Sequence, residues 1–278
     1  MAWLAEILEQ LGQQPVVGYT PQTAPAAEPS ALAALALMAH GRPEPALVAG
    51  EFVRRCQNLD GAVGIRAGET IPGWPSSLAI LAWNAVDKEK FSGAISLARN
   101  WVLGMQGQTS EQSEEFGHNT MLVGWSWADG THSWSEPTAL QVIALKRIGD
   151  GGHARTREAI RLLIDRLLPA GGCNYGNTTV LGQVLRPHVQ PTGVVLTALA
   201  GEPDRDGRME KSIAYLRNTL GKQSTATSLA WGLLGLAAHK IQPPQAQDWL
   251  AAAHVRVMQH DRSPHKLALL ALAAAGRI

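Results

Sequence analysis

The sequence predicts an all-α protein built from six helical hairpins, and three observations support this prediction. Alanine and leucine, two of the strongest helix formers, account for 41 and 34 of the 278 residues. A phrase of proline, small or hydroxyl residues and an Ala/Leu-rich run recurs along the chain. Each such run follows a segment with apolar residues at positions i, i+3, i+4 and i+7, the pattern of a helix with one buried face.

The recurring phrase marks the starts of six helices that are apolar on nearly all sides. Proline is favoured in the first turn of a helix, where its missing N–H costs no hydrogen bond. Because the runs 31–38 and 267–275 have no polar face, we expect these helices to be buried all round. The expected starts, which should share one polarity, are residues 29, 75, 137, 191, 226 and 264, the fifth without proline.

A helix with one polar face precedes each apolar helix. In the first of them, Trp3, Ile7 and Leu11 fall on one stripe, whereas Glu6 and Glu9 fall outside it. Helices of this kind cover a core with their apolar face. The six predicted covering helices span residues 3–11, 45–57, 88–103, 153–168, 208–220 and 244–259.

Six such hairpins can close into a double ring, an (α/α)6 toroid, or stack into an open solenoid. An open solenoid would leave one edge of its inner layer exposed along its length. Helices that are apolar on every face therefore favour the closed ring. We expect one toroid domain over residues 1–278, with a long loop insertion at 104–135 whose second half could cover one mouth of the barrel.

Composition excludes several classes of protein. The 24 Lys and Arg nearly cancel the 23 Asp and Glu, and without a basic run no nucleic-acid partner is expected. No apolar stretch of about 18 residues is free of charges and breakers, which argues against a transmembrane segment. The first residues lack the basic region of a signal peptide, so a cytoplasmic location is expected. The two cysteines, Cys56 and Cys173, form no disulfide framework.

The segment 166–177, Arg-Leu-Leu-Pro-Ala-Gly-Gly-Cys-Asn-Tyr-Gly-Asn, resembles the Gln/Trp-type repeat of squalene–hopene cyclases. Segments 57–64 and 124–134 are looser copies. The chain is thus similar to the terpene cyclase and protein prenyltransferase superfamily. The resemblance implies an α/α toroid and an apolar, perhaps isoprenoid, ligand at the barrel mouth.

Two motifs of that superfamily are missing from the sequence. The Asp-x-Asp-Asp motif with which squalene–hopene cyclases protonate an alkene does not occur. Neither cysteine follows an aspartate by two residues, as the zinc ligands of prenyltransferases do. His118, His132, His188 and Cys173 lie in the long third and fourth loops without short ligand spacing. We therefore expect neither a metal nor another cofactor.

Glu136 is the candidate catalytic residue. It precedes Pro137 at the start of an apolar helix and follows a cluster of tryptophans, whose burial of the carboxyl would raise its pKa toward that of a general acid. The alternative is that Glu136 stabilises the positive end of its helix dipole. Glu28 holds the same slot in the first repeat, apart from that cluster, which favours this structural role.

Aromatic, histidine and arginine side chains near this slot are the candidate ligand-binding residues. Tryptophans in such repeats either tie one hairpin to the next or form the wall of a binding site. An arginine there could bind an anionic head group. The candidates are Trp74, Trp125, Trp127, His132, Trp134, Tyr175, Arg186 and His188.

Two functions follow, and the sequence leaves both open. The first is a terpene cyclase-like enzyme, an isomerase, lyase or transferase, in which Glu136 protonates an apolar substrate at the mouth. The second is a non-catalytic toroid that binds a lipid, a peptide or a partner protein.

Overall fold

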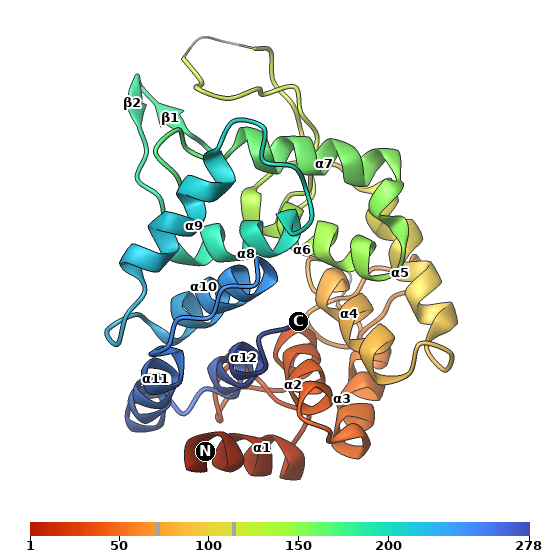
Figure 1. Ribbon diagram of the computed structural model, residues 1–278. Coiled ribbons are helices and arrows are strands. Elements are labelled where there is room, and N and C mark those ends of the chain that lie inside the picture. The colour runs from red at the N-terminus through yellow and green to blue at the C-terminus, as the bar shows by residue number, and fades with distance from the viewer. Residues whose placement is uncertain (70–72, 113–114) are drawn as a thin grey trace. The chain divides into compact units, whose positions relative to one another are not determined.

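The computed structural model describes residues 1–69, 73–112 and 115–278 (Figure 1). Helix makes up 56% of the described residues, which confirms the all-α prediction. The predicted insertion 104–135 is described except for its residues 113–114. No helix among the described residues is long and apolar enough to cross a bilayer.

The helices alternate along the chain as the sequence predicts. The six covering helices are α1 (Ala2–Gln13), α3 (Pro43–Arg55), α5 (Ser92–Gly104), α7 (Ala154–Asp165), α9 (Arg208–Thr219) and α11 (Ala246–His260). The six apolar helices are α2 (Ala27–Ala39), α4 (Ser76–Asp87), α6 (Ser135–Arg147), α8 (Val189–Leu199), α10 (Ala226–Ala238) and α12 (Pro264–Ala275). A 3-10 turn at Asp150–Gly152 and a hairpin of β1 (Thr179–Val180) and β2 (Gln183–Val184) complete the described elements.

The chain forms two compact units. Unit 1 contains Met1–Gly104, Gly221–Ala230 and Pro244–Ile278, and unit 2 contains Met105–Leu220 and Trp231–Pro243. The single domain expected from the sequence stays a prediction.

Burial separates the two kinds of helix as expected. In α2, Ala27 and every residue of the run 29–37 are buried, whereas α1 buries only Ile7, Leu8 and Leu11. Burying one leucine side chain contributes about 1.5–3 kcal/mol to folding, so the apolar helices supply most of the hydrophobic stabilisation.

A hydroxyl group fixes the loop that leads into four of the apolar helices. The hydroxyl residue after each proline of the recurring phrase bonds to the backbone of a residue 13 positions earlier in three repeats and 19 earlier in the fourth. The difference of six residues equals the length of the hairpin from Thr179 to Val184, so this hairpin is an insertion in the fourth repeat. The pairs are Ser30 with Val17, Ser76 with Val63, Thr138 with Trp125 and Thr192 with Cys173.

One pair of neighbouring apolar helices in each unit is joined at the C-terminal ends. In unit 1, the His40 ring at the end of α2 lies 2.9 Å from the Ala271 carbonyl oxygen of α12. In unit 2, Lys146 Nζ at the end of α6 donates to the carbonyls of Ala198 and Ala200 after α8, at 3.0 and 2.8 Å. The Lys146 ammonium also offsets the negative end of the α6 helix dipole. α2 and α12 therefore run in the same direction, and so do α6 and α8, whereas one polarity for all six apolar helices stays a prediction.

Candidate functional site

The side chains at the second position of four apolar helices meet in pairs, one pair in each unit. In unit 2, Gln190 of α8 donates from Nε2 to Oε1 of Glu136 in α6 at 2.8 Å. In unit 1, Glu28 of α2 faces His265 of α12, with 3.5 Å between Glu28 Oε1 and His265 Nε2. Positions that repeat along the sequence therefore meet across neighbouring helices.

Glu28 is the centre of the unit 1 cluster. Its Oε2 accepts hydrogen bonds from the Tyr19 hydroxyl at 2.6 Å and from Trp74 Nε1 at 3.2 Å. The rings of Tyr19 and His265 lie 5.5 Å apart, so aromatic groups flank the carboxylate. Trp74, a predicted ligand-binding residue, thus binds a carboxylate of its own chain.

Hydrogen bonding keeps Glu28 ionised. Burial by itself raises the pKa of this carboxyl, but the hydrogen bond and charge of His265 and the hydrogen bonds from Tyr19 and Trp74 outweigh it, so the pKa lies below its usual value. Burial, and then the Glu28 charge, raise the pKa of Tyr19. An ionised carboxylate has no proton to transfer, so this glutamate joins α2, α4 and α12 rather than acting as an acid. Glu28, which was expected to lie apart from the tryptophan cluster of Glu136, has one tryptophan partner, Trp74.

Glu136 has a comparable role as an acceptor in unit 2. It lies in the first turn of α6, where the helix dipole favours a negative charge, and it bonds to Gln190 of the adjacent helix. The buried thiol of Cys173 lies close by. Burial, with a smaller contribution from the Glu136 charge, raises the pKa of this thiol to about 12. The cysteine is therefore a neutral core residue.

The predicted tryptophans of unit 2 differ in their surroundings. Trp125 is only 2% exposed, and the Arg155 guanidinium lies 4.7 Å from its ring centroid. This tryptophan ties the insertion to α7, one of the two roles that the sequence left open. Trp127 and Trp134 are half-buried. The backbone of Gly176 packs on the Trp134 ring, where an added Cβ would lie 3.2 Å from Cε3.

Tyr175 and His188 lie together beside the start of α6. Both are exposed, and their ring centroids are 5.1 Å apart. The Tyr175 carbonyl accepts from the backbone N–H of Ser135 at 2.8 Å, which places this pair next to Glu136 along α6. The structure therefore brings Trp134, Glu136, Tyr175 and His188 into one region.

Two other candidates, His132 and Arg186, are exposed and have contacts of their own. The exposed His132 ring has its Nδ1 3.4 Å from the carbonyl oxygen of Gln108. Arg186 is exposed between the hairpin and α8, and its carbonyl accepts from Asn174 Nδ2 at 2.7 Å.

Sequence reasoning missed the β1–β2 hairpin. Leu181 at its tip is 93% exposed, and Val180 and Val184 beside it are exposed as well. Leu181 has a φ of 49° and Gly182 a φ of 74°, the backbone of a two-residue turn that usually contains Asn-Gly. A non-glycine residue in this left-handed region costs about 1 kcal/mol. The sequence feature that could have predicted the hairpin is the Leu-Gly pair between two valines. It lies in the fourth repeat, which is six residues longer than the other three at this point.

His118 holds the insertion against the base of this hairpin. The side chain is buried, and its Nδ1 lies 3.2 Å from the Thr178 hydroxyl oxygen. Burial, together with the nearby Arg166 charge, lowers its pKa to about 4. The described residues contain no group of three side chains that could hold a metal ion. His118 is therefore a neutral packing residue.

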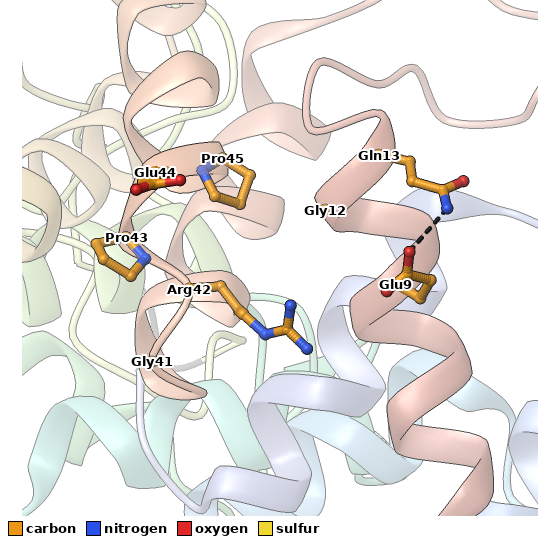
Figure 2. A pocket seen from close by; sticks show the side chains of 8 residues that line it. All are labelled: Glu9, Gly12, Gln13, Gly41, Arg42, Pro43, Glu44 and Pro45. Atoms are coloured by element: carbon orange, nitrogen blue, oxygen red, sulfur yellow. Dashed lines mark hydrogen bonds between the residues drawn. The ribbon is translucent and has the colours of Figure 1, made fainter.

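Two surface grooves lie away from the predicted site residues. The first, of about 480 Å³, lies between α1 and the α2–α3 turn (Figure 2). Figure 2 shows Arg42 extending from that turn toward α1, where Glu9 and Gln13 bond to each other at 2.8 Å. The second groove, of about 650 Å³, lies between α7 and the connection from α8 to α9.

No protein-family model matches the chain, and no curated protein matches it either. Several solved structures, however, are similar to the chain. Salmonella alpha-2-macroglobulin reacted with methylamine matches with a TM-score of 0.58 and 13% identity, over 99% of this chain and 17% of its own. A type II terpene cyclase from Scytonema matches with a TM-score of 0.58 and 15% identity, over 95% of this chain and 78% of its own. A glycosidase variant matches with a TM-score of 0.58 and 10% identity, over 99% and 97%.

At these identities the likeness shows the fold alone. The chain therefore has the all-α toroid fold that the sequence predicts. The chain spans only 17% of the macroglobulin, and the three named neighbours carry out different functions, so the fold does not fix the activity.

Proposed function

We propose that this protein is a non-catalytic toroid that binds a lipid surface through its β1–β2 hairpin. The observation that carries this proposal is Leu181, an almost fully exposed aliphatic side chain held in a left-handed backbone conformation. Strained residues persist where the surrounding structure and the function require them. At the hairpin tip an asparagine would adopt the same backbone conformation without strain, yet the chain has a leucine there.

The chemistry of the hairpin suits a lipid surface. Its six residues, Thr-Val-Leu-Gly-Gln-Val, include no charged group whose desolvation would oppose entry into the acyl region. Full burial of the Leu181 side chain would contribute about 1.5–3 kcal/mol. Arg186 follows the hairpin by two residues and is exposed, as a contact to a lipid phosphate would require.

The glutamates support a non-catalytic role. Glu28 and Glu136 hold the same slot in two repeats, and each accepts a hydrogen bond from a side chain at the start of the adjacent helix. Such acceptors stabilise helix junctions and need no proton to transfer.

A vesicle-binding experiment with the variant Leu181→Asn tests the proposal. With vesicles of phosphatidylcholine and phosphatidylglycerol, we expect binding to weaken about ten- to a hundredfold, because the leucine burial is lost. The free energy of unfolding should stay the same or rise by about 1 kcal/mol, since asparagine tolerates a positive φ. Stability and binding would thus change in opposite directions.

The matched control is Leu59→Asn. Leu59 is a fully exposed leucine in a loop of unit 1, outside the positive-φ residues. This variant should bind vesicles like the wild type. Equal binding by wild type and Leu181→Asn, or no binding by either, would contradict the proposal.

A second candidate is an enzyme that acts on an isoprenoid or another apolar substrate. The observation that favours it is the likeness to a type II terpene cyclase over 78% of that chain, together with Trp134 two residues before Glu136. If Glu136 is a general acid, Glu136→Gln should lower turnover at least about a hundredfold. If it only stabilises the helix start, the variant should lose up to about 1 kcal/mol of stability and keep its ligand.

A further inference from the structure

The groove beside α7 combines an apolar floor with cationic walls. Arg157, Ile160, Arg161 and Ile164 share one face of α7, at the spacing of successive helical turns. The opposite wall is the connection from α8 to α9. The groove has a volume of about 650 Å³, within the range of small-molecule sites. The facing residues of that connection are Glu202, Pro203, Arg205 and Asp206.

Both acidic residues of the groove are already neutralised by the protein. Glu202 binds Lys146 Nζ at 3.1 Å and Arg157 Nη1 at 2.9 Å. Burial by itself raises the pKa of Glu202, but these two cations outweigh it and lower the pKa. Asp206 is bound by Arg208 Nε at 2.5 Å.

Two arginines of the groove keep an uncompensated charge. Arg161 on α7 and Arg205 on the opposite wall are exposed, and neither has an ion-pair partner within the described parts of the chain. With both acids paired, the groove carries a net positive charge in a protein whose total is only +1. A guanidinium recognises a carboxylate or phosphate through two parallel hydrogen bonds.

The floor of the groove is apolar. Ile164 is half-buried and Ala154 and Pro203 are exposed, whereas Ile160 is 1% exposed and offers almost no surface of its own. A purely ionic ligand would gain nothing from this surface, whereas an aliphatic body would bury it. We infer that the groove binds a free, small amphipathic anion, with a carboxylate or phosphate head between Arg161 and Arg205 and an aliphatic body over Ile164 and Pro203.

The inference does not depend on the proposed lipid-surface function, because it uses none of the hairpin residues. The variant Leu181→Asn should therefore bind such an anion like the wild type. Loss of anion binding in the arginine variants and loss of vesicle binding in the hairpin variant are separate results.

Titration calorimetry of the full chain with sodium decanoate tests the inference. We expect saturable binding at one site, at least about tenfold tighter than that of decanol or decyltrimethylammonium. Arg161→Gln and Arg205→Gln should each weaken decanoate binding about ten- to a hundredfold, because a hydrogen bond to a charged group is lost. Decyl phosphate should follow the same pattern.

The control variant is Arg217→Gln, which changes an exposed arginine of α9 outside the groove and should leave decanoate binding unchanged. Equal affinities for decanoate and decanol, or arginine variants that bind like the wild type, would overturn the inference. It would also be overturned if a glutamate-rich peptide bound in an arginine-dependent way while decanoate did not, because the occupant would then be an acidic protein segment.

Discussion

Replacing Gly193 with alanine tests a close contact between two helices of unit 2. Gly193 lies in α8, and a Cβ at this position would be 2.3 Å from the carbonyl oxygen of Trp231 and 2.7 Å from the backbone nitrogen of Gly232 in α10. The contact is reciprocal, since a Cβ on Gly235 would lie 2.7 Å from the Gly193 oxygen. The two backbones therefore touch, and no side-chain rotation can make room for a methyl group.

The size of the effect follows from this geometry. Ordinary Cβ contacts lie at 3.4–4 Å, so α8 and α10 would have to separate by about 1 Å. Overpacking costs about 1–3 kcal/mol, and the upper end applies here because backbone rather than a flexible side chain must move. Alanine returns about 1 kcal/mol through its higher helix propensity. We expect a net loss of about 2 kcal/mol in the free energy of unfolding.

Urea unfolding followed by circular dichroism and tryptophan fluorescence measures this loss. The matched control is Gly93→Ala in α5, where an added Cβ meets no atom within 4 Å. That variant should be as stable as the wild type or more stable by up to about 1 kcal/mol. If Gly193→Ala and Gly93→Ala shift stability equally, the backbone contact between α8 and α10 does not exist.

Two further substitutions test the core and the insertion. Trp231→Ala removes a side chain of α10 that is 5% exposed. It should lower the free energy of unfolding, measured in denaturant melts, by about 3–5 kcal/mol. A loss below about 1 kcal/mol would show that α10 is not an inner helix. His118 is buried, and its pKa of about 4 lies below the value of about 6.5 in the unfolded chain. The unfolded chain therefore binds the proton more tightly than the folded one. The free energy of unfolding of the wild type should fall as the pH drops from about 6.5 to 4. His118→Asn should remove this part of the pH dependence, and an unchanged unfolding profile over that range would show that His118 is not buried neutral.

The candidate site was predictable from the sequence in part. Glu136 and His188 each lie at the start of an apolar helix, and helix starts are marked by local residues such as Pro137 and Pro191. Tyr175 joins them through a hydrogen bond from Ser135 to its carbonyl, which only folding brings about. The role of Trp125 was not predictable, because a tryptophan that packs under an arginine and one that lines a site have the same local sequence.

The sequence by itself determined the elements of this fold. Helix periodicity, proline in the first turn and the absence of a polar face are local properties, and they marked the covering and apolar helices to within a few residues of their starts.

Only the tertiary structure decided which side chains meet. Trp74 binds Glu28 across 46 residues and Gln190 binds Glu136 across 54, and such pairs depend on how parallel helices pack side by side. The exposure of Leu181 and the meeting of Arg161 with Arg205 at one groove likewise follow from packing. The physical reason is that a residue's neighbours in sequence set its backbone, whereas burial and charge pairing depend on groups that folding brings from distant parts of the chain.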